Sequence, residues 1–126
     1  MSEAKKILIV EDDEGFCSIL ETKFEGTEFA TIIAEDGETG LEKARKEHPD
    51  LVLLDIMLPG IDGIEVAKKM RQAGVRVPIV YLTNVSDTER ISEAMLVTGG
   101  ETDYIVKTDV RIEDIIERIR KRLSLK

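Results

Sequence analysis

Short runs of apolar residues recur along the chain and alternate with longer stretches that mix apolar and charged residues. The apolar runs span residues 7–10, 29–34, 51–54, 79–82 and 104–106. The first, third and fourth runs are nearly continuous in Ile, Leu and Val, which is typical of parallel strands buried on both faces. The pattern therefore predicts five strands, at least three of them inside a parallel sheet.

The stretches between the runs have the spacing of amphipathic helices, in which apolar residues recur every three to four positions. Phe16, Ile19 and Leu20 form the first such stripe, which we expect to be buried while the Lys, Arg and Glu residues around it face solvent. A longer stripe near the end of the chain consists of Ile112, Ile115, Ile116, Ile119 and Leu123. These stripes predict helices that pack on the sheet.

Two pairs of residues have the spacing of capping boxes, which open helices. Asp62 with Glu65, and Ser86 with Glu89, follow the third and fourth runs. Glycines that commonly end helices stand at Gly74, Gly99 and Gly100. The whole pattern is five strands alternating with five helices, which predicts an α/β fold with right-handed crossovers and helices on both faces of the sheet.

Polar residues gather at the carboxyl ends of the predicted strands, where open parallel sheets bind their ligands. They are Glu11, Asp12 and Asp13 after the first strand, Asp55 after the third, Thr83 after the fourth and Lys107 after the fifth. Each of these is common at such a position for structural reasons alone. Their joint placement at four strand ends is what indicates a functional site.

Three of these carboxylates, on Glu11, Asp12 and Asp55, would repel one another in a single crevice unless a cation intervenes. Magnesium suits the set because it takes one or two carboxylates together with water and phosphoryl oxygens. Lys107 adds a cation and Thr83 a hydroxyl donor. A carboxylate can act as the nucleophile in such a site, which would give an acyl phosphate on Asp55.

Composition and charge narrow the partners. The 126 residues carry a formal net charge of −8, which argues against nucleic acid or an anionic membrane as the main partner. Cys17 is the only cysteine and His48 the only histidine, so a disulfide or a zinc site is not expected, and Cys17 is interpreted as a small buried helix residue. With no signal-peptide pattern or long apolar run, we expect a cytoplasmic protein.

Four motifs carry a resemblance to a known family. They are KILIVEDD at 6–13, DLVLLDIMLPGIDG at 50–63, VPIVYLTN at 77–84 and GGETDYIVKT at 99–108. They closely resemble the receiver domains of response regulators in two-component signalling, over about residues 5–123. The resemblance implies a flavodoxin-like (βα)5 fold with the strand order 2-1-3-4-5. We expect one receiver domain over residues 1–126, without an output domain.

The resemblance also implies a role for each site residue. Asp55 would accept a phosphoryl group from a phosphohistidine on a sensor kinase or a phosphotransfer protein. Asp12 would bind Mg²⁺ directly, Glu11 would bind it through water, and the backbone carbonyl of Met57 would complete the protein ligands. Asp13 falls one place beyond the acidic pair of the family, so it is interpreted as a helix-start residue. The chain would catalyse its own phosphorylation and a slow autodephosphorylation.

The response to phosphorylation is implied in the same way. Thr83 and Lys107 would contact the phosphoryl oxygens, and Tyr104 matches the switch aromatic that moves inward with the threonine. The alternative for Tyr104 is a half-buried tyrosine with its hydroxyl in water. An unidentified partner would read the face made by the fourth helix, the fifth strand and the fifth helix, and a dimer could form there. The kinase is expected to dock near Phe16 and Ile19, although Phe16 could equally belong to the core.

Two positions depart from the usual family pattern, and a third bears on the lifetime of the phosphorylated form. Thr108 follows Lys107 where a proline is common, which puts the approach of the lysine in doubt. Asn84 replaces a usual alanine, where it could narrow access or add a hydrogen bond. Met57 offers no group to orient water, so we expect a fairly long-lived aspartyl phosphate.

Other classes fit the residues less well. A haloacid-dehalogenase-type phosphatase would need a second Asp two residues after the nucleophile, where Met57 stands. A flavodoxin-like cofactor carrier would need a phosphate-cradling loop after the first strand, where the sequence EDDEG is too acidic. A receiver-like interaction module that is not phosphorylated stays open.

Overall fold

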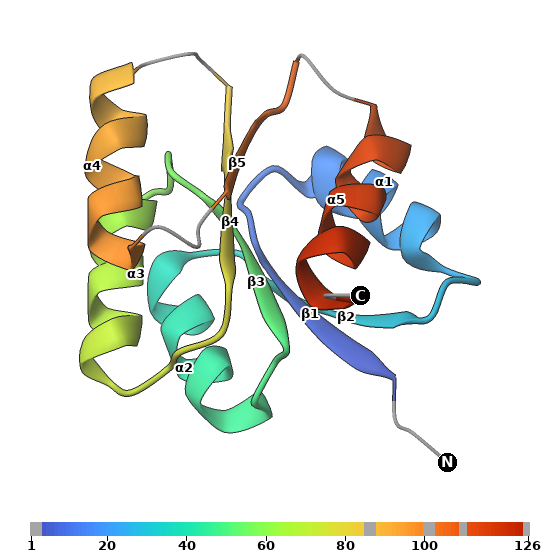
Figure 1. Cartoon of the computed structure of the whole chain (residues 1–126), viewed down its shortest axis with the longest axis horizontal. Coiled ribbons are helices and arrows are strands. Elements are labelled where there is room, and N and C mark those ends of the chain that lie inside the picture. Colours follow the sequence, from blue (N-terminus) through green and yellow to red (C-terminus); the bar gives the residue numbers. More distant parts are fainter. Residues whose placement is uncertain (1–3, 85–87, 100–102, 109–110, 125–126) are drawn as a thin grey trace.

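The computed structural model describes residues 4–84, 88–99, 103–108 and 111–124, and within them strands and helices alternate along the chain (Figure 1). The strands are β1 (Lys5–Val10), β2 (Phe29–Ala34), β3 (Leu51–Asp55), β4 (Ile79–Thr83) and β5 (Asp103–Val106). The helices are α1 (Glu14–Phe24), α2 (Gly37–Glu47), α3 (Gly63–Gln72), α4 (Thr88–Thr98) and α5 (Ile112–Ser124). The predicted element order is confirmed.

All the strands pair in parallel in the order β2-β1-β3-β4-β5, as expected from the flavodoxin-like pattern. Every residue of β3 and β4 is buried, and so are the last four residues of β1. These are the three continuous apolar runs of the sequence. They form the inner strands of the sheet, where helices cover both faces and apolar residues are therefore favoured on both. β2 lies at an edge and is only partly buried.

The sheet separates two clusters of buried side chains. One lies on the side of α2, α3 and α4, and the other on the side of α1 and α5 (Figure 1). Successive strand residues point to opposite faces, so Ile7 and Ile9 enter the α1/α5 cluster while Leu8 and Val10 enter the other. None of the helices in the described residues has the length and apolar character needed to cross a membrane.

One prediction for the first helix is wrong. Ile19 was expected in the buried stripe of α1, but half of its surface is exposed. The buried residues of α1 are Cys17, Leu20 and Phe24, whose spacing of three and four defines the inward face. Each residue advances about 100° around a helix, so Ile19 turns away from that face. Cys17 is buried as predicted.

Aspartates cap the N-termini of α1, α2 and α3. The Asp13 side chain accepts a hydrogen bond from the backbone N–H of Phe16 at 3.1 Å, which confirms its helix-start role. Asp62 accepts from the N–H of Glu65 at 3.0 Å, so the predicted cap of α3 is also confirmed. The other predicted capping residue, Ser86, lies outside the described residues.

Gly63 allows α3 to start directly against the end of β3. A Cβ atom at this position would lie 2.1 Å from the backbone oxygen of Asp55, a distance that no real contact permits. The N–H of Gly63 donates to the carbonyl of Ile56 at 2.8 Å. The glycine therefore fixes the backbone beside Asp55. Of the predicted helix-ending glycines, Gly74 and Gly99 have positive φ angles, of 86° and 81°, and Gly100 lies outside the described residues.

Candidate functional site

Three polar or charged residues are buried in the described part of the chain, and all of them lie at the carboxyl edge of the sheet. Glu11 follows β1, Asp55 ends β3 and Thr83 ends β4, with exposed fractions of 0%, 2% and 3%. A protein interior accepts such groups only when they find partners or a bound ion. Packing alone does not require polar side chains at this edge of the sheet, so their burial here indicates a functional role.

Glu11, Asp12 and Asp55 form one acidic cluster. One carboxylate oxygen from each lies within 4.8 Å of the others. Asp12 is exposed while the other two are buried, so the cluster opens toward solvent on the side of Asp12. The sequence expectation that these three side chains meet is borne out by the geometry, because the ends of β1 and β3 are neighbours in the sheet.

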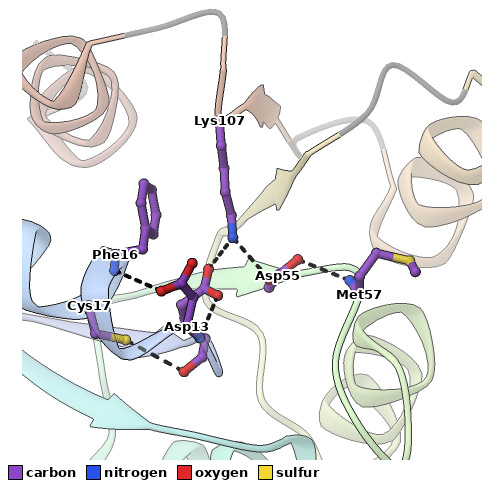
Figure 2. Close-up of polar contacts among 7 residues, drawn as sticks. Asp13, Phe16, Cys17, Asp55, Met57 and Lys107 are labelled. Atoms are coloured by element: carbon purple, nitrogen blue, oxygen red, sulfur yellow. Dashed lines mark hydrogen bonds and ion pairs between the residues drawn. The ribbon is translucent and has the colours of Figure 1, made fainter.

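Lys107 lies between the two buried carboxylates, and Figure 2 shows its ammonium pointing toward Asp55. Its Nζ is 2.6 Å from Oε1 of Glu11 and 3.1 Å from Oδ2 of Asp55. Only 8% of the lysine side chain is exposed. Although burial alone would lower the pKa of Lys107, the hydrogen bond and charge of Glu11 together with the charge of Asp55 raise it above its usual value. The ammonium is thus held charged between its partners.

Burial raises the pKa of Glu11, whereas it opposes the charged form of Lys107 by lowering its pKa. Desolvation raises the pKa of this carboxyl group to about 7, and the negative charge of Asp55 adds to the rise, against the opposing effect of Lys107. Its Oε2 accepts a hydrogen bond from the N–H of Asp13 at 3.0 Å. Its Oε1 is paired with Nζ of Lys107 at 2.6 Å. Both oxygens of this buried carboxyl group therefore have a partner.

Asp55 is oriented from two sides (Figure 2). Its Oδ1 accepts a hydrogen bond from the backbone N–H of Met57 at 3.0 Å, and its Oδ2 faces Lys107. The Met57 side chain is 59% exposed and carries no hydrogen-bond donor. The carboxylate therefore has a fixed rotamer at the end of β3, held by a backbone N–H on one oxygen and an ammonium on the other.

The end of β5 is joined to the end of β4 next to the acidic cluster. The N–H of Lys107 donates to the carbonyl of Thr83 at 2.7 Å. Tyr104, on the strand that leads to the lysine, is 39% exposed, so this structure has the aromatic ring turned outward. Asn84 is exposed, and the described peptide bonds, including the one before Thr108, are not cis. The lysine reaches Asp55 in this arrangement.

Phe16 was considered at the sequence level only as a docking or core residue, and its relation to the lysine was missed. The Nζ atom of Lys107 lies 4.7 Å from the centroid of the Phe16 ring. The ring is partly buried and packs against the α1/α5 cluster. Nothing in the local sequence signals this contact, because Phe16 and Lys107 come from opposite ends of the chain.

A comparison with protein families identifies the fold and site together. Residues 7–120 match the model of the response regulator receiver domain. The chain belongs to this family. Its acidic cluster is consistent with the phosphoacceptor site of a receiver domain, and clusters of this composition are typical of the receiver Mg²⁺ site.

Relatives of this receiver domain are regulators about twice its length. It is 38% identical over 120 residues to the alkaline phosphatase synthesis transcriptional regulatory protein PhoP of Bacillus subtilis, covering 90% of this chain and 49% of that protein. It is 41% identical over 118 residues to the response regulator ArlR of Staphylococcus saprophyticus, covering 94% and 52%. The chain thus spans about half the length of the curated relatives it matches.

Solved receiver domains have the same fold. A CheY-like response regulator receiver domain protein from Methanospirillum hungatei superposes with a TM-score of 0.83 at 31% identity, covering 98% of this chain and 95% of that one. A two-component response regulator from Clostridium difficile superposes with a TM-score of 0.86 at 28% identity, covering 95% and 96%. The receiver fold and the two-component family are therefore established for this chain.

Proposed function

We propose that this receiver domain is a magnesium-dependent phosphorylation switch whose phosphoryl acceptor is Asp55. The observation that carries the proposal is the position of that carboxylate. It is buried at the end of β3, 3.1 Å from the ammonium of Lys107, and within 4.8 Å of the Glu11 and Asp12 oxygens. The phosphoryl donor would be a phosphohistidine on a sensor histidine kinase or a phosphotransfer protein, as the family implies.

The transfer is a substitution at phosphorus. An oxygen of Asp55 forms the new P–O bond while the P–N bond of the phosphohistidine breaks, and the bonding electron pair leaves with the imidazole. Lys107 would neutralise charge on the phosphoryl oxygens, and the hydroxyl of Thr83 would donate to one of them. Both groups stand at neighbouring strand ends, so little reorganisation is needed to stabilise the charge that moves onto the incoming group.

The acidic cluster fits a hard divalent cation. Its three carboxylates each place an oxygen within 4.8 Å of the others, and two of the three residues are buried. Oxygen ligands of this kind suit Mg²⁺, which when bound would offset the charge of both the carboxylates and the phosphoryl oxygens. We assign Asp12, Asp55 and the Met57 carbonyl as direct ligands, with Glu11 acting through water.

The readout would use the surface of α4, β5 and α5. Tyr104 lies outward on β5, and Thr83 accepts the backbone hydrogen bond of Lys107, so a shift of either strand end reaches the other. A new charge can select between two arrangements that already have similar free energies. An outward-to-inward movement of Tyr104 would change the surface that a partner, or a second copy of the chain, contacts.

Several similar proteins are DNA-binding response regulators by name, among them MtrA of Mycobacterium tuberculosis, which is 39% identical over 119 residues. This chain matches about half of that protein. The net charge of −8 makes the receiver itself a poor ligand for DNA. We infer that its own partners are proteins, and that any effect on DNA would pass through another module.

The phosphorylated form should be long-lived. Met57 stands two residues after the acceptor, and its side chain is exposed and unable to orient an attacking water. Hydrolysis would then depend on water that Met57 does not position. The phosphorylated protein should keep its label for at least minutes, and loss of the label within seconds would contradict this part of the proposal.

The test is phosphorylation with a radiolabelled small acyl phosphate, with and without Mg²⁺. We expect acid-stable, base-labile label on the native chain only when Mg²⁺ is present. Asp55→Asn should abolish the label. Asp12→Asn should lose most of the labelling rate, and Mg²⁺ should no longer increase the rate that remains. Asp13→Asn, which alters a neighbouring acid but keeps a capping side chain, serves as the matched control and should be labelled normally. Equal labelling of native protein and Asp55→Asn would overturn the proposal.

A further inference from the structure

Within the described residues, the ammonium of Lys107 lies against three groups, and one of them is uncharged. Glu11 and Asp55 contribute carboxylate oxygens, and Phe16 contributes the face of its ring, whose centroid lies 4.7 Å from Nζ. Figure 2 shows the Lys107 side chain extending from the end of β5, with the ring of Phe16 on one side and Asp55 below the ammonium. The distance falls within the range for attraction between a cation and an aromatic face.

The ring is held in place by elements that do not depend on the lysine. Phe16 lies in the first turn of α1, where its N–H donates to the capping carboxylate of Asp13 at 3.1 Å. Its side chain packs against the buried cluster under α1 and α5. The ring is therefore a fixed surface beside the flexible side chain of Lys107. It limits the rotamers that this side chain can adopt.

We propose that Phe16 is a positioning residue for Lys107, acting through the π face of its ring to keep the ammonium over Asp55 before and after phosphoryl transfer. The inference rests on the proposed function, since it names a residue that serves the same site. Phe16 does not touch the reacting atoms. Its contribution is to restrict the lysine to positions from which it can reach a phosphoryl group.

The charges in the site explain why a neutral contact is useful. When Asp55 becomes an acyl phosphate, its contact with Lys107 would change in both charge and distance, and a bound Mg²⁺ would compete with the lysine for the Glu11 carboxylate. The attraction of the ring for the ammonium does not depend on either change. Among the described groups around the ammonium, the ring of Phe16 is thus the one whose attraction stays constant through the reaction. The ring also shields one side of the ammonium from water, and charge interactions are stronger where water is excluded.

Ordinary packing is the alternative explanation, and it makes a different prediction. If the ring only filled space, leucine would replace it with little effect, and the electron density of the ring would not matter. If the ring positions the ammonium, Phe16→Leu should slow phosphorylation by a small acyl phosphate. It should also weaken the binding of beryllofluoride, which mimics the phosphoryl group on Asp55, and we expect each effect to be about 3- to 10-fold. Phe16→Tyr, which keeps an aromatic face, should retain most of both.

A fluorinated series makes the test independent of shape. Replacing Phe16 with mono-, di- and trifluorophenylalanine withdraws electron density from the ring face in steps while leaving the ring nearly the same size. We expect beryllofluoride affinity to fall stepwise with the number of fluorines. A flat response along the series would overturn the proposal, because packing would then explain the contact.

Two further measurements separate positioning from a loss of stability. In a Lys107→Met background, Phe16→Leu should have no additional effect on phosphorylation, whereas a purely structural effect would persist. The side-chain methylene protons of Lys107 should show an upfield ring-current shift in the NMR spectrum of the unphosphorylated protein. That shift should vanish in Phe16→Leu and remain in Phe24→Leu, a matched aromatic loss on the inward face of the same helix.

The outcomes also distinguish this inference from the proposed function. If the native chain takes no label from the acyl phosphate, the proposed function fails, while the ring-current shift still reports whether the contact exists. If the native chain is labelled, but the Phe16→Leu variant is labelled at the same or a higher rate, the positioning role alone is refuted.

Discussion

The ammonium of Lys107 lies 2.6 Å from Oε1 of Glu11, and both side chains are almost completely shielded from solvent. The pair joins the end of β5 to the end of β1, although these strands are not neighbours in the sheet. Two charges removed from water are expensive individually, and each makes the burial of the other acceptable. The stability of the fold and the chemistry of its edge therefore depend on the same contact.

Removing the lysine should expose this dependence. Lys107→Met leaves two buried carboxylates without their cation, so the free energy of unfolding in metal-free buffer should fall by about 3 kcal/mol. Added Mg²⁺ should restore more stability to the variant than to the native chain, because it supplies the missing charge. Urea unfolding with and without Mg²⁺ measures both effects.

Lys23→Met is the matched control for this substitution. Lys23 makes an ion pair of similar length with Glu113, 3.0 Å, but both side chains are about half exposed. Its loss should change stability little, because water replaces the partner. A similar loss in both variants would show that burial of the Lys107 pair does not matter.

Gly63→Ala tests the close approach of α3 to the end of β3. The new Cβ would overlap the backbone oxygen of Asp55, so either α3 or the acceptor strand must move. We expect a loss of at least about 3 kcal/mol in unfolding free energy, together with slower phosphorylation. Gly15→Ala, on α1, meets only an oxygen of Asp13 at 3.4 Å and should cause no comparable loss. Thermal unfolding and acyl phosphate labelling provide the readouts.

The fold was largely predictable because its central strands are buried on both faces. Continuous apolar runs cannot be confused with an amphipathic helix at that length, so β3 and β4 were predicted to within one residue of their observed ends. Ile19 was placed wrongly because an apolar residue at the border of a helical stripe fits the pattern whether or not it is covered. Only the packing of α1 decides that case.

The sequence predicted which charged residues meet at the edge of the sheet, but it did not predict which of them contact one another. Parallel strands bring their carboxyl ends to one edge, so Glu11, Asp55 and Lys107 had to be near one another. Which carboxylate the lysine pairs with depends on the rotamer of a long side chain, and sequence does not encode that directly. The contact between the ring of Phe16 and the ammonium was missed for the same reason.

Asp62 should make stability sensitive to acid. Burial opposes ionisation of this carboxyl, but the N–H of Glu65 and the guanidinium of Arg90, 2.9 Å away, outweigh it and lower its pKa below the ordinary 3.8. A lowered native pKa means that ionised Asp62 contributes stability above pH 3.8, and that this contribution is lost as the pH falls below 3.8 toward the native pKa.

Asp62→Asn isolates this effect because asparagine still caps helices well. The native chain should be more stable than the variant at neutral pH, and the difference should shrink below pH 3.8. Chemical unfolding of both proteins at a series of pH values measures it. Parallel pH profiles for the two proteins would contradict the assignment.

Tyr81 connects the centre of the sheet to α4. Its hydroxyl donates to the backbone oxygen of Ala94 at 3.1 Å inside the core, and burial raises the pKa of the hydroxyl to about 12. Tyr81→Phe should reduce unfolding free energy by about 1 kcal/mol and speed amide exchange along α4. Tyr104→Phe, with its ring 39% exposed, should leave amide exchange in α4 unchanged before phosphorylation. Exchange measured on both variants tests the connection.

The two clusters of buried side chains on opposite faces of the sheet have no member in common. Each compartment can therefore tolerate repacking while the other keeps its shape, with the sheet as a shared partition. The helix expected to meet the kinase, α1, belongs to one compartment, and α4 to the other. Surfaces for signal input and for α4-dependent output can consequently diverge separately among relatives, provided that the strand ends between them still hold the same few charges.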